Sequence, residues 1–343
     1  MAHSTEVHGE ITIRDVAREA GVSTATVSRV INGTGRVSSD KQSRVIQVMG
    51  RLGYVMNQQA RSLAGGKSQV IGLLASEISH PFVGEIIKGI EDELAALQFD
   101  LLLYTTHRQK TRESTYVATL ARGLADGLLL IVPRNIDAYV EALQQQRYPH
   151  VVLSNSARNG ASNVVTAQYY QGAYDAVSYL IRLGHRRIGF IMGIEEIPNA
   201  VDQLSAYRQA LLDHDLSPDV HLIQHGEYIQ REGFTAARTL LALPERPTAI
   251  FAANDLSAFG AMEAAREQGL RIPDDLSIIG CDDLPDAVHA HPALTSVHYG
   301  IDEIGRQGTR LLLEAIAHPA APPRHISLPM QLIERDSCLP LTR

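Results

Sequence analysis

Tryptophan is absent from this sequence of 343 residues, and only two cysteines are present. Two thiols, Cys281 and Cys338, cannot form a disulfide framework, and their separation does not match a zinc site. No run of about 18 apolar residues is available to span a membrane, and the first ten residues lack the basic and apolar regions of a signal peptide. We therefore expect a cytoplasmic protein with reduced thiols and no membrane association.

Motifs of common catalytic sites are also absent. The sequence contains no GxSxG nucleophile elbow, no HExxH helix and no CxxC pair. His289 and His291 form an i, i+2 pair in an expected loop without a third nearby ligand, so we interpret them as solvated side chains. We expect no catalytic residue, no metal site and no cofactor, which argues against an enzyme.

The composition is that of an ordinary globular chain, with 45% apolar and 20% charged residues. At roughly 100 to 200 residues per domain, the length predicts two or three compact units. We expect a disordered tail over residues 1–10. The rest of the chain has enough apolar residues to bury a sizeable core.

Charge is distributed unevenly along the chain. The net charge is −7 overall, but residues 11–68 contain nine basic and three acidic residues, a net +6, and the chain after residue 68 carries about −11. Because Lys and Arg neutralise phosphates in complexes with nucleic acids, a basic head on an acidic body indicates that only the head approaches a polyanion.

The segment ITIRDVAREAGVSTATVSRVING predicts two short helices joined by a glycine turn. Thr12 can cap the first helix, Gly21 ends it, and Ser23 can cap the second. This pattern is typical of a helix-turn-helix, whose second helix lies in the major groove of DNA with its outward side chains at the base edges. The outward side chains here are Thr24, Ala25, Thr26, Ser28 and Arg29.

A third amphipathic helix is expected from Ser39, and it would close a small three-helix core. After Tyr54 the chain is polar and rich in small residues until an apolar strand begins at residue 69. We therefore expect a DNA-binding domain over residues 11–56, a hinge over 57–68 and a second, larger domain over 69–343.

That larger domain alternates short apolar runs with amphipathic segments, in two successive series. Such alternation predicts parallel sheets covered by helices on both faces, and two series predict two lobes. The segment LTSVHYGIDEIGRQGTRLLLEAI is expected to cross back between the lobes. Since open α/β sheets bind ligands beyond the carboxyl ends of their strands, we expect a binding cleft between the lobes.

Polar side chains follow two of the expected strands in this domain. Asn254 and Asp255 follow AIFAA, and Asp282 follows LSIIGC. A carboxylate can accept two hydroxyl hydrogen bonds at once, as a polyhydroxylated ligand requires. For Asp255, a helix N-cap is the preferred interpretation.

The order of several motifs resembles that of the LacI/GalR family of bacterial transcription regulators over nearly the whole chain. They are TIRDVAREAGVSTATVSRVING, GYVMNQQARSLAGGKSQVIGLL, HPFVGEIIKGIEDEL, ADGLLLIVP, YLIRLGHRRIGFI, RPTAIFAANDLSAFGAM, GLRIPDDLSIIGCDDLP and PALTSVH. The resemblance implies an all-α helix-turn-helix head and a two-lobed, periplasmic-binding-protein-like effector domain with doubly wound parallel sheets. The N-lobe would span about residues 69–169 and 300–327, and the C-lobe would span about residues 170–299 and 328–340.

The resemblance also implies DNA-contacting residues. Thr24 and Ala25 match the positions that mainly choose operator bases, whereas Thr26, Ser28 and Arg29 match positions that contact phosphates and neighbouring bases. Further matching positions are Tyr54, Asn57, Arg61, Leu63 and Ala64. In the family the hinge forms a helix only on DNA, and an apolar side chain at the position of Leu63 can unstack and kink the duplex; the alternative is that Leu63 packs on the head.

For the effector, the resemblance implies contacts from Tyr228, Asn254 and Asp282, and Phe82 is a further candidate because it follows the first expected strand of the larger domain. Gln168 and Gln203 are also expected to contact the effector, and both depart from the family, because Gln203 stands where Arg is usual and Gln168 where an acidic pair is common. We therefore expect a neutral effector, with a sugar or glycoside preferred over a nucleobase, a nucleoside or a protein co-effector. Without tryptophan, stacking must come from Tyr or Phe.

The expected function is that of an effector-controlled repressor of carbohydrate-use genes. Two subunits would present two heads to a pseudo-palindromic operator. Because the sequence lacks a leucine heptad that could form a tetrameric coiled coil, a homodimer is expected. Release of DNA by the effector is preferred over co-repression. A sugar-binding protein without a DNA function is the main rival, and it would not need a helix-turn-helix.

Overall fold

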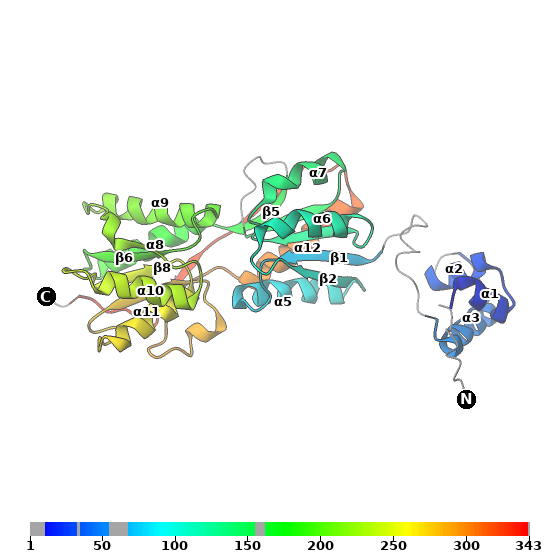
Figure 1. Cartoon of the computed structure of the whole chain (residues 1–343), viewed down its shortest axis with the longest axis horizontal. Helices are drawn as coiled ribbons and strands as arrows, with labels where there is room; N and C mark the ends of the chain where they lie inside the picture. Colours follow the sequence, from blue (N-terminus) through cyan, green and yellow to red (C-terminus); the bar gives the residue numbers. More distant parts are fainter. Residues whose placement is uncertain (1–10, 33–34, 55–67, 155–161, 342–343) are drawn as a thin grey trace, which may run out of the picture. The chain divides into compact units, whose positions relative to one another are not determined.

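The computed structural model describes residues 11–32, 35–54, 68–154 and 162–341, which belong to two compact units divided between Gly66 and Lys67 (Figure 1). The expected tail over residues 1–10 and nearly all of the expected hinge lie outside the described residues. Each unit is described by itself below.

The first unit, the head, contains the three predicted helices, α1 (Ile13–Ala20), α2 (Thr24–Asn32) and α3 (Ser39–Leu52). Asp15 fixes the start of α1, because its carboxylate accepts hydrogen bonds from the backbone N and the hydroxyl of Thr12, at 3.0 and 2.7 Å. Gly21 ends α1 with φ +63°, a conformation that favours glycine. The Ser23 hydroxyl accepts from the Thr26 N–H at 3.2 Å and caps α2, as expected.

Small apolar side chains from all three helices form the head core. An ion pair of 2.6 Å between Arg51 and Glu19 adds a link from α3 to α1. Because the core uses only the inner stripe of α2, the opposite face of that helix is left outward. The buried core residues are Val16, Ala17, Ala20, Val27, Val45 and Val48.

The second unit consists of two lobes, each built on one sheet. The N-lobe sheet has the strand order β11-β5-β4-β3-β1-β2, and all its strand pairs are parallel. Its elements are β1 (Val70–Ala75), α5 (Pro81–Ala95), β2 (Asp100–Thr105), η1 (Lys110–Arg112), α6 (Glu113–Ala121), β3 (Gly127–Ile131), η2 (Ile136–Ala138), α7 (Val140–Gln145), β4 (His150–Leu153), β5 (Asn163–Ala167), α12 (Ile301–Ala317) and β11 (His325–Leu328).

The C-lobe sheet has the order β12-β10-β9-β8-β6-β7. Its elements are α8 (Tyr169–Arg182), β6 (Ile188–Met192), α9 (Pro198–Asp213), η3 (Val220–Leu222), β7 (Ile223–His225), α10 (Gln230–Leu241), β8 (Ala249–Ala252), α11 (Asp255–Glu267), β9 (Ser277–Cys281), η4 (Pro285–Ala287), β10 (Thr295–His298) and β12 (Gln331–Ile333). The predicted parallel sheets are confirmed, with one exception, since β12 pairs antiparallel with β10.

The chain crosses between the lobes three times, from β5 to α8, from β10 to α12 and from β11 to β12. The segment that the sequence analysis expected to cross back between the lobes lies at the second crossing. The third explains the antiparallel strand: β11 runs toward the C-lobe, and the chain continues after two residues into a sheet whose other strands point back toward the N-lobe. A strand entering in that direction must run against its neighbour.

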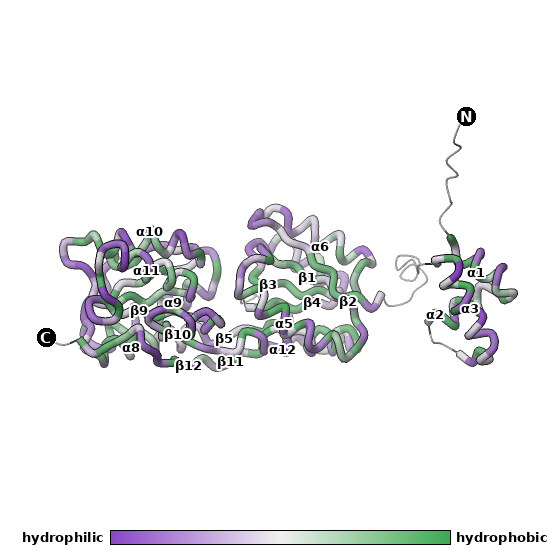
Figure 2. The backbone as a smooth tube through the Cα atoms, turned by 90° about the horizontal axis from the view of Figure 1, so that it is seen from below, coloured by the Kyte–Doolittle hydropathy of each residue, from purple (hydrophilic) through white to green (hydrophobic). Residues whose placement is uncertain are grey.

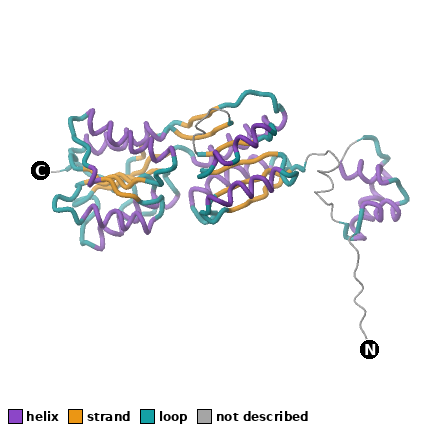
Figure 3. The backbone as a smooth tube through the Cα atoms, turned by 45° about the horizontal axis from the view of Figure 1, so that its top comes forward, coloured by secondary structure: helices purple, strands orange, loops and turns teal. Residues whose placement is uncertain are grey.

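Alternating side chains along the strands divide the core of each lobe between two faces. In β1, Ile71 and Leu73 belong to the cluster that contains α5 and α12, whereas Val70 and Leu74 pack with α6 and α7. Strands therefore lie between helical layers in both lobes (Figure 3), and apolar colour concentrates on them (Figure 2). Because the strands are buried on both faces, their sequences are continuous apolar runs.

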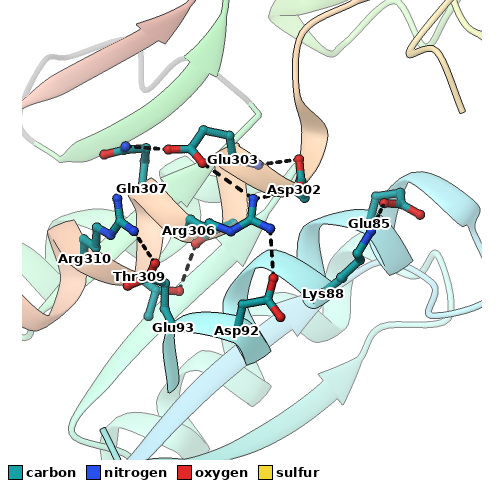
Figure 4. Close-up of polar contacts among 11 residues, drawn as sticks. Glu85, Lys88, Asp92, Glu93, Asp302, Glu303, Arg306, Gln307, Thr309 and Arg310 are labelled. Atoms are coloured by element: carbon teal, nitrogen blue, oxygen red, sulfur yellow. Dashed lines mark hydrogen bonds and ion pairs between the residues drawn. The ribbon is translucent and has the colours of Figure 1, made fainter. Parts of the chain in front are cut away.

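Helices α5 and α12 are in close contact at two glycines. A Cβ atom on Gly89 would lie 1.8 Å from the carbonyl oxygen of Asp302, and one on Gly305 would lie 2.1 Å from that of Ile86. Ion pairs flank this contact (Figure 4), with Arg306 binding Asp92 at 2.8 Å across the two helices. The pair is consequently a tightly fixed layer of the N-lobe.

Candidate functional site

Helix α2 presents a polar outer face in the head. Thr24, Ala25 and Arg29 are exposed, and Thr26 and Ser28 are half-buried. The five side chains predicted to approach DNA therefore lie together on or beside the face opposite the head core. Threonine, serine and arginine side chains can donate to or accept from base edges and phosphates.

Tyr54 follows the end of α3 and packs on the head core, with its backbone N–H bonded to the carbonyl of Met49 at 3.0 Å. Partial burial raises the pKa of the Tyr54 phenol above its ordinary value. The other residues predicted to contact DNA from the hinge, Asn57, Arg61, Leu63 and Ala64, lie outside the described residues.

A cavity of about 130 Å³ lies between the N-lobe and the C-lobe. Each strand from β1 to β10 contributes to its wall a residue from the segment that follows it. The cavity thus lies at the carboxyl ends of both parallel sheets, where the sequence predicted a cleft. Since a bound water needs about 10 to 15 Å³ by this kind of measure, the space admits roughly ten water-sized groups, the size of a monosaccharide or a nucleobase.

Four of the predicted effector residues line this cavity, namely Phe82 from the N-lobe and Tyr228, Asn254 and Asp282 from the C-lobe. The ring of Tyr228 lies over Gly193, where a Cβ atom would be 2.0 Å from the Tyr228 Cζ. Only glycine leaves room for this ring position. These four residues therefore bring two aromatic rings, an amide and a carboxyl group to the cavity wall.

Asp282 ends a chain of hydrogen bonds along the cavity wall. The Tyr299 hydroxyl donates to Asp282 Oδ1 at 2.7 Å, the Tyr169 hydroxyl donates to that of Tyr299 at 3.1 Å, and the Ser154 and Tyr169 hydroxyls are 2.6 Å apart. Burial, together with the nearby carboxyl of Asp255, raises the pKa of Asp282 well above its ordinary value. All four members of this chain line the cavity.

The interpretation of Asp255 as a helix cap is wrong. Asn254 caps α11, since its side-chain oxygen accepts from the Ser257 N–H at 3.0 Å. Asp255 is fully buried one residue later, and its carboxyl accepts from the Leu284 N–H at 2.7 Å and from the Ser296 hydroxyl at 2.6 Å. It thereby holds the segment after β9, in which Asp282 has the unfavourable φ of +116°.

Hydrogen bonds other than the one between Ser154 and Tyr169 also join the lobes at the cavity. The Nε2–H of His80 donates to the carbonyl of Tyr228 at 3.2 Å, and the side-chain amide of Asn199 donates to the carbonyl of Ser154 at 2.8 Å. Burial lowers the pKa of His80. A neutral imidazole with its proton on Nε2 fits the observed bond.

Gln168 and Gln203, from which a neutral effector was predicted, do not line the cavity. Gln168 is exposed at the start of α8, and Gln203 is 1% exposed with its amide donating to the carbonyl of Ala253 at 3.0 Å. Arg108 and Arg134, which the sequence analysis did not select, do line the cavity. The argument for a neutral effector therefore loses its basis.

In the described residues, no group of three or more His, Cys, Asp or Glu side chains is placed to hold a metal ion. His289 and His291 are exposed, and His185 is buried with its Nδ1 3.0 Å from the hydroxyl of Thr248. Among the helices described, none is both long and apolar enough to cross a membrane.

Two family models match the chain. Residues 12–57 match the bacterial regulatory proteins of the lacI family, and residues 177–338 match the periplasmic binding protein-like domain. The HTH-type transcriptional repressor PurR of Edwardsiella ictaluri is 34% identical over 328 residues, which cover 95% of this chain and 96% of that protein. The chain belongs to the LacI family. Catabolite control protein A of Priestia megaterium is also 34% identical over 328 residues, covering 95% of this chain and 99% of that protein.

Solved LacI-family structures share the whole architecture. The lac repressor dimer bound to operator and the anti-inducer ONPF has a TM-score of 0.85 at 28% identity, covering 96% of this chain and 99% of that chain. The complex of the transcriptional regulator CelR with cellobiose has a TM-score of 0.74 at 31% identity, covering 95% of this chain and 99% of that chain. The predicted fold class is confirmed. The LacI-family protein is a DNA-binding transcriptional repressor, and its family consists of regulators, not enzymes.

Proposed function

We propose that the protein represses carbohydrate-use genes and leaves its operator when a sugar-sized, polyhydroxylated effector enters the cavity between the lobes. The observation that carries this proposal is the composition of the cavity wall, to which both lobes contribute through the ends of their strands. An occupant that contacts both lobes can favour one lobe angle over another through its difference in affinity for the two states.

The side chains of the cavity suit hydroxyl groups. Asp282 can accept through the carboxyl oxygen that does not bond Tyr299, and the side-chain amide of Asn254 can donate, while Phe82 and Tyr228 supply apolar faces. Two structural relatives contain sugars, cellobiose in the CelR complex and ribose in a LacI-family regulator from Enterococcus faecium. The latter has a TM-score of 0.72 at 28% identity, covering 80% of this chain and all of that chain.

On the DNA side, Thr24 and Ala25 would choose bases, and Thr26, Ser28 and Arg29 would contact phosphates and neighbouring bases. Leu63 as a minor-groove wedge, with Asn57, Arg61 and Ala64 beside it, stays a prediction. A homodimer would place two heads on a pseudo-palindromic operator. The lac repressor relative, solved as a dimer on operator, supports this assembly.

A nucleobase or nucleoside is the second candidate effector. Two of the aromatic side chains that line the cavity, Phe82 and Tyr228, favour it, because a flat base can stack on either ring. The cavity volume fits a base as well as a monosaccharide, so only ligand binding distinguishes the two.

The test is a thermal-shift screen of the full chain against monosaccharides, disaccharides, pentoses, nucleobases and nucleosides. A ligand at 100 times its dissociation constant adds about 2.7 kcal/mol to the free energy of unfolding. Every hit is then added to the protein bound to an operator that has been selected from random DNA. A sugar that stabilises the protein and weakens operator binding supports the proposal. Stabilisation by nucleobases or nucleosides alone supports the second candidate. If no ligand of the panel stabilises the protein, both candidates are contradicted.

A further inference from the structure

We infer that the effector carries an anionic group, a carboxylate or a phosphate, and that Arg134 of the N-lobe binds it. This inference rests on the proposed function, because it specifies the ligand of the same cavity. A polyhydroxylated molecule with such a group is a sugar acid or a sugar phosphate. The two share an anion with oxygens placed side by side, which is the chemistry that the arginine recognises.

Arg134 is a cavity-lining cation without a hydrogen-bonded carboxylate. Its Nε is enclosed by protein and has no hydrogen-bond partner. The side chain is 22% exposed, and the carboxylate oxygen facing its Nη2 belongs to Glu196 of the C-lobe, 4.0 Å away, beyond hydrogen-bond length. Since Glu196 is itself 62% exposed, water screens this contact and the charge of Arg134 is compensated only in part.

The other cavity arginine differs in this respect. The Nε of Arg108 lies 2.6 Å from Oε2 of Glu77, a carboxylate of the same lobe. That guanidinium edge is already occupied. Arg134 has no carboxylate within hydrogen-bond length, so of the two cavity arginines it is the one whose guanidinium can donate to a carboxylate or phosphate of a ligand.

The segment that carries Arg134 is held in place by a buried acid. Glu113, which is 3% exposed, accepts from the backbone N–H groups of Arg134 and Asn135 with its two oxygens, both at 2.9 Å. The Tyr139 hydroxyl donates to the same carboxylate at 3.3 Å. A buried carboxylate is tolerated because it is hydrogen-bonded, and here its bonds fix the backbone of a cavity residue before any ligand arrives.

The opposite wall does not cancel this charge. Burial raises the pKa of Asp282 well above its ordinary value, so this carboxyl carries less negative charge near neutral pH than an exposed one. Glu227 is exposed at the edge of the cavity, and burial lowers the pKa of His80, which leaves the imidazole uncharged. A hydroxyl-bearing end facing Asp282 and an anionic end facing Arg134 would match both walls.

The experiment compares matched ligands by thermal shift and isothermal titration calorimetry on the full chain: glucose with glucuronate and glucose 6-phosphate, galactose with galacturonate, ribose with ribose 5-phosphate, and inorganic phosphate alone. We expect at least one anionic member to bind more tightly than its neutral parent. Arg134→Gln should weaken that member about tenfold or more and leave the neutral parent nearly unchanged. Carboxylate and phosphate members distinguish the two forms of the anion.

Two control variants separate anion binding from other roles of Arg134. Arg122→Gln removes the same charge from an exposed position of the same lobe outside the cavity wall, and it should retain the preference for the anionic ligand. Glu196→Gln should keep or strengthen that preference. If Arg134 served only as a partner of Glu196 across the cleft, the two variants Glu196→Gln and Arg134→Gln would change binding equally.

Three results overturn the inference: neutral parents that bind as well as their acids and phosphates, an Arg134→Gln variant that keeps the preference, and no binding by any anion. A neutral sugar that binds and releases the operator would then leave the proposed function intact. Conversely, if inorganic phosphate binds through Arg134 while no sugar-derived ligand does, the anion site stands and the sugar class is wrong. Glu113→Gln, which loosens the segment without removing the guanidinium, should give a smaller loss than Arg134→Gln.

Discussion

The hydroxyl of Tyr299 donates a hydrogen bond of 2.7 Å to Oδ1 of Asp282. Tyr299 belongs to the segment that crosses from β10 to α12, and Tyr169, 3.1 Å from it, begins the helix after the crossing from β5. Two of the three connections between the lobes are thus bonded to the cavity wall. We therefore expect a change in lobe angle to alter the surroundings of Asp282.

Replacing Tyr299 by phenylalanine should lower the free energy of unfolding by about 1 to 2 kcal/mol, because a buried carboxyl loses a hydrogen-bond donor while the ring remains. Urea unfolding of the full chain measures the change. Tyr170→Phe is the matched control, since Tyr170 is 41% exposed and should give a change near zero. Equal stability of both variants would show that the Tyr299 bond contributes little.

The buried carboxyl of Asp255 should make stability fall as the pH rises. Burial raises the pKa of Asp255 to about 7, whereas the unfolded chain releases this proton near 3.8. Between these values the folded state holds the proton more tightly, so raising the pH favours unfolding, by on the order of 4 kcal/mol in total. Asp255→Asn resembles the protonated form and should flatten the dependence.

Urea unfolding at several pH values between about 4 and 7 tests this prediction. The exposed Asp137 provides a control, and Asp137→Asn should follow the wild-type curve. If Asp255→Asn has the same slope as the wild type, another buried group, Asp282 first, is responsible for the pH dependence.

Gly89→Ala should destabilise the second unit by about 3 kcal/mol or more, because the new Cβ would lie 1.8 Å from the carbonyl oxygen of Asp302 and the two helices would have to separate. Gly84→Ala is a control on the same helix, with no atom within 4 Å of its Cβ. It should stabilise α5 by about 0.5 to 1 kcal/mol. Chemical denaturation of both variants gives the comparison, and a tolerated Gly89→Ala would mean that the helices separate at little cost.

Arg29→Ala should weaken operator binding about tenfold to a hundredfold, the usual effect of losing a good base or phosphate contact, while effector binding stays nearly constant. Fluorescence anisotropy with a labelled operator measures the loss. Arg51→Ala removes the same charge from α3, where Arg51 pairs with Glu19, and should have a smaller effect. Unchanged affinity in Arg29→Ala would contradict the assignment of α2 as the recognition helix.

Local patterns in the sequence predicted most of the fold. Thr12, Gly21 and Ser23 mark helix ends through bonds within three or four residues, so the head helices could be predicted one by one. Strands buried on both faces leave continuous apolar runs, and the first polar residues after them, such as Asn254 and Asp282, were predicted to line the cavity for that reason.

Residues whose position depends on distant contacts could not be predicted in the same way. Arg134 faces the cavity because Glu113, on a different element, fixes its backbone, and no periodicity records that bond. Gln203 was selected from its place in the family pattern, yet it turns to the carbonyl of Ala253, fifty residues away. The assignment of the α11 cap to Asp255 instead of Asn254 has a similar origin. Asp255 is buried because its carboxyl binds the backbone N–H of Leu284, in a loop that is distant in the sequence.

The three crossings between the lobes also determine what an incomplete chain can be. A polypeptide that ends shortly before α12 lacks two elements of the N-lobe, the strand β11 and the covering helix α12. It also lacks the strand β12 of the C-lobe sheet. Premature termination late in the gene therefore damages both lobes at once, and neither lobe can be produced from one uninterrupted stretch of coding sequence. A single-lobe fragment would require segments joined in a new order.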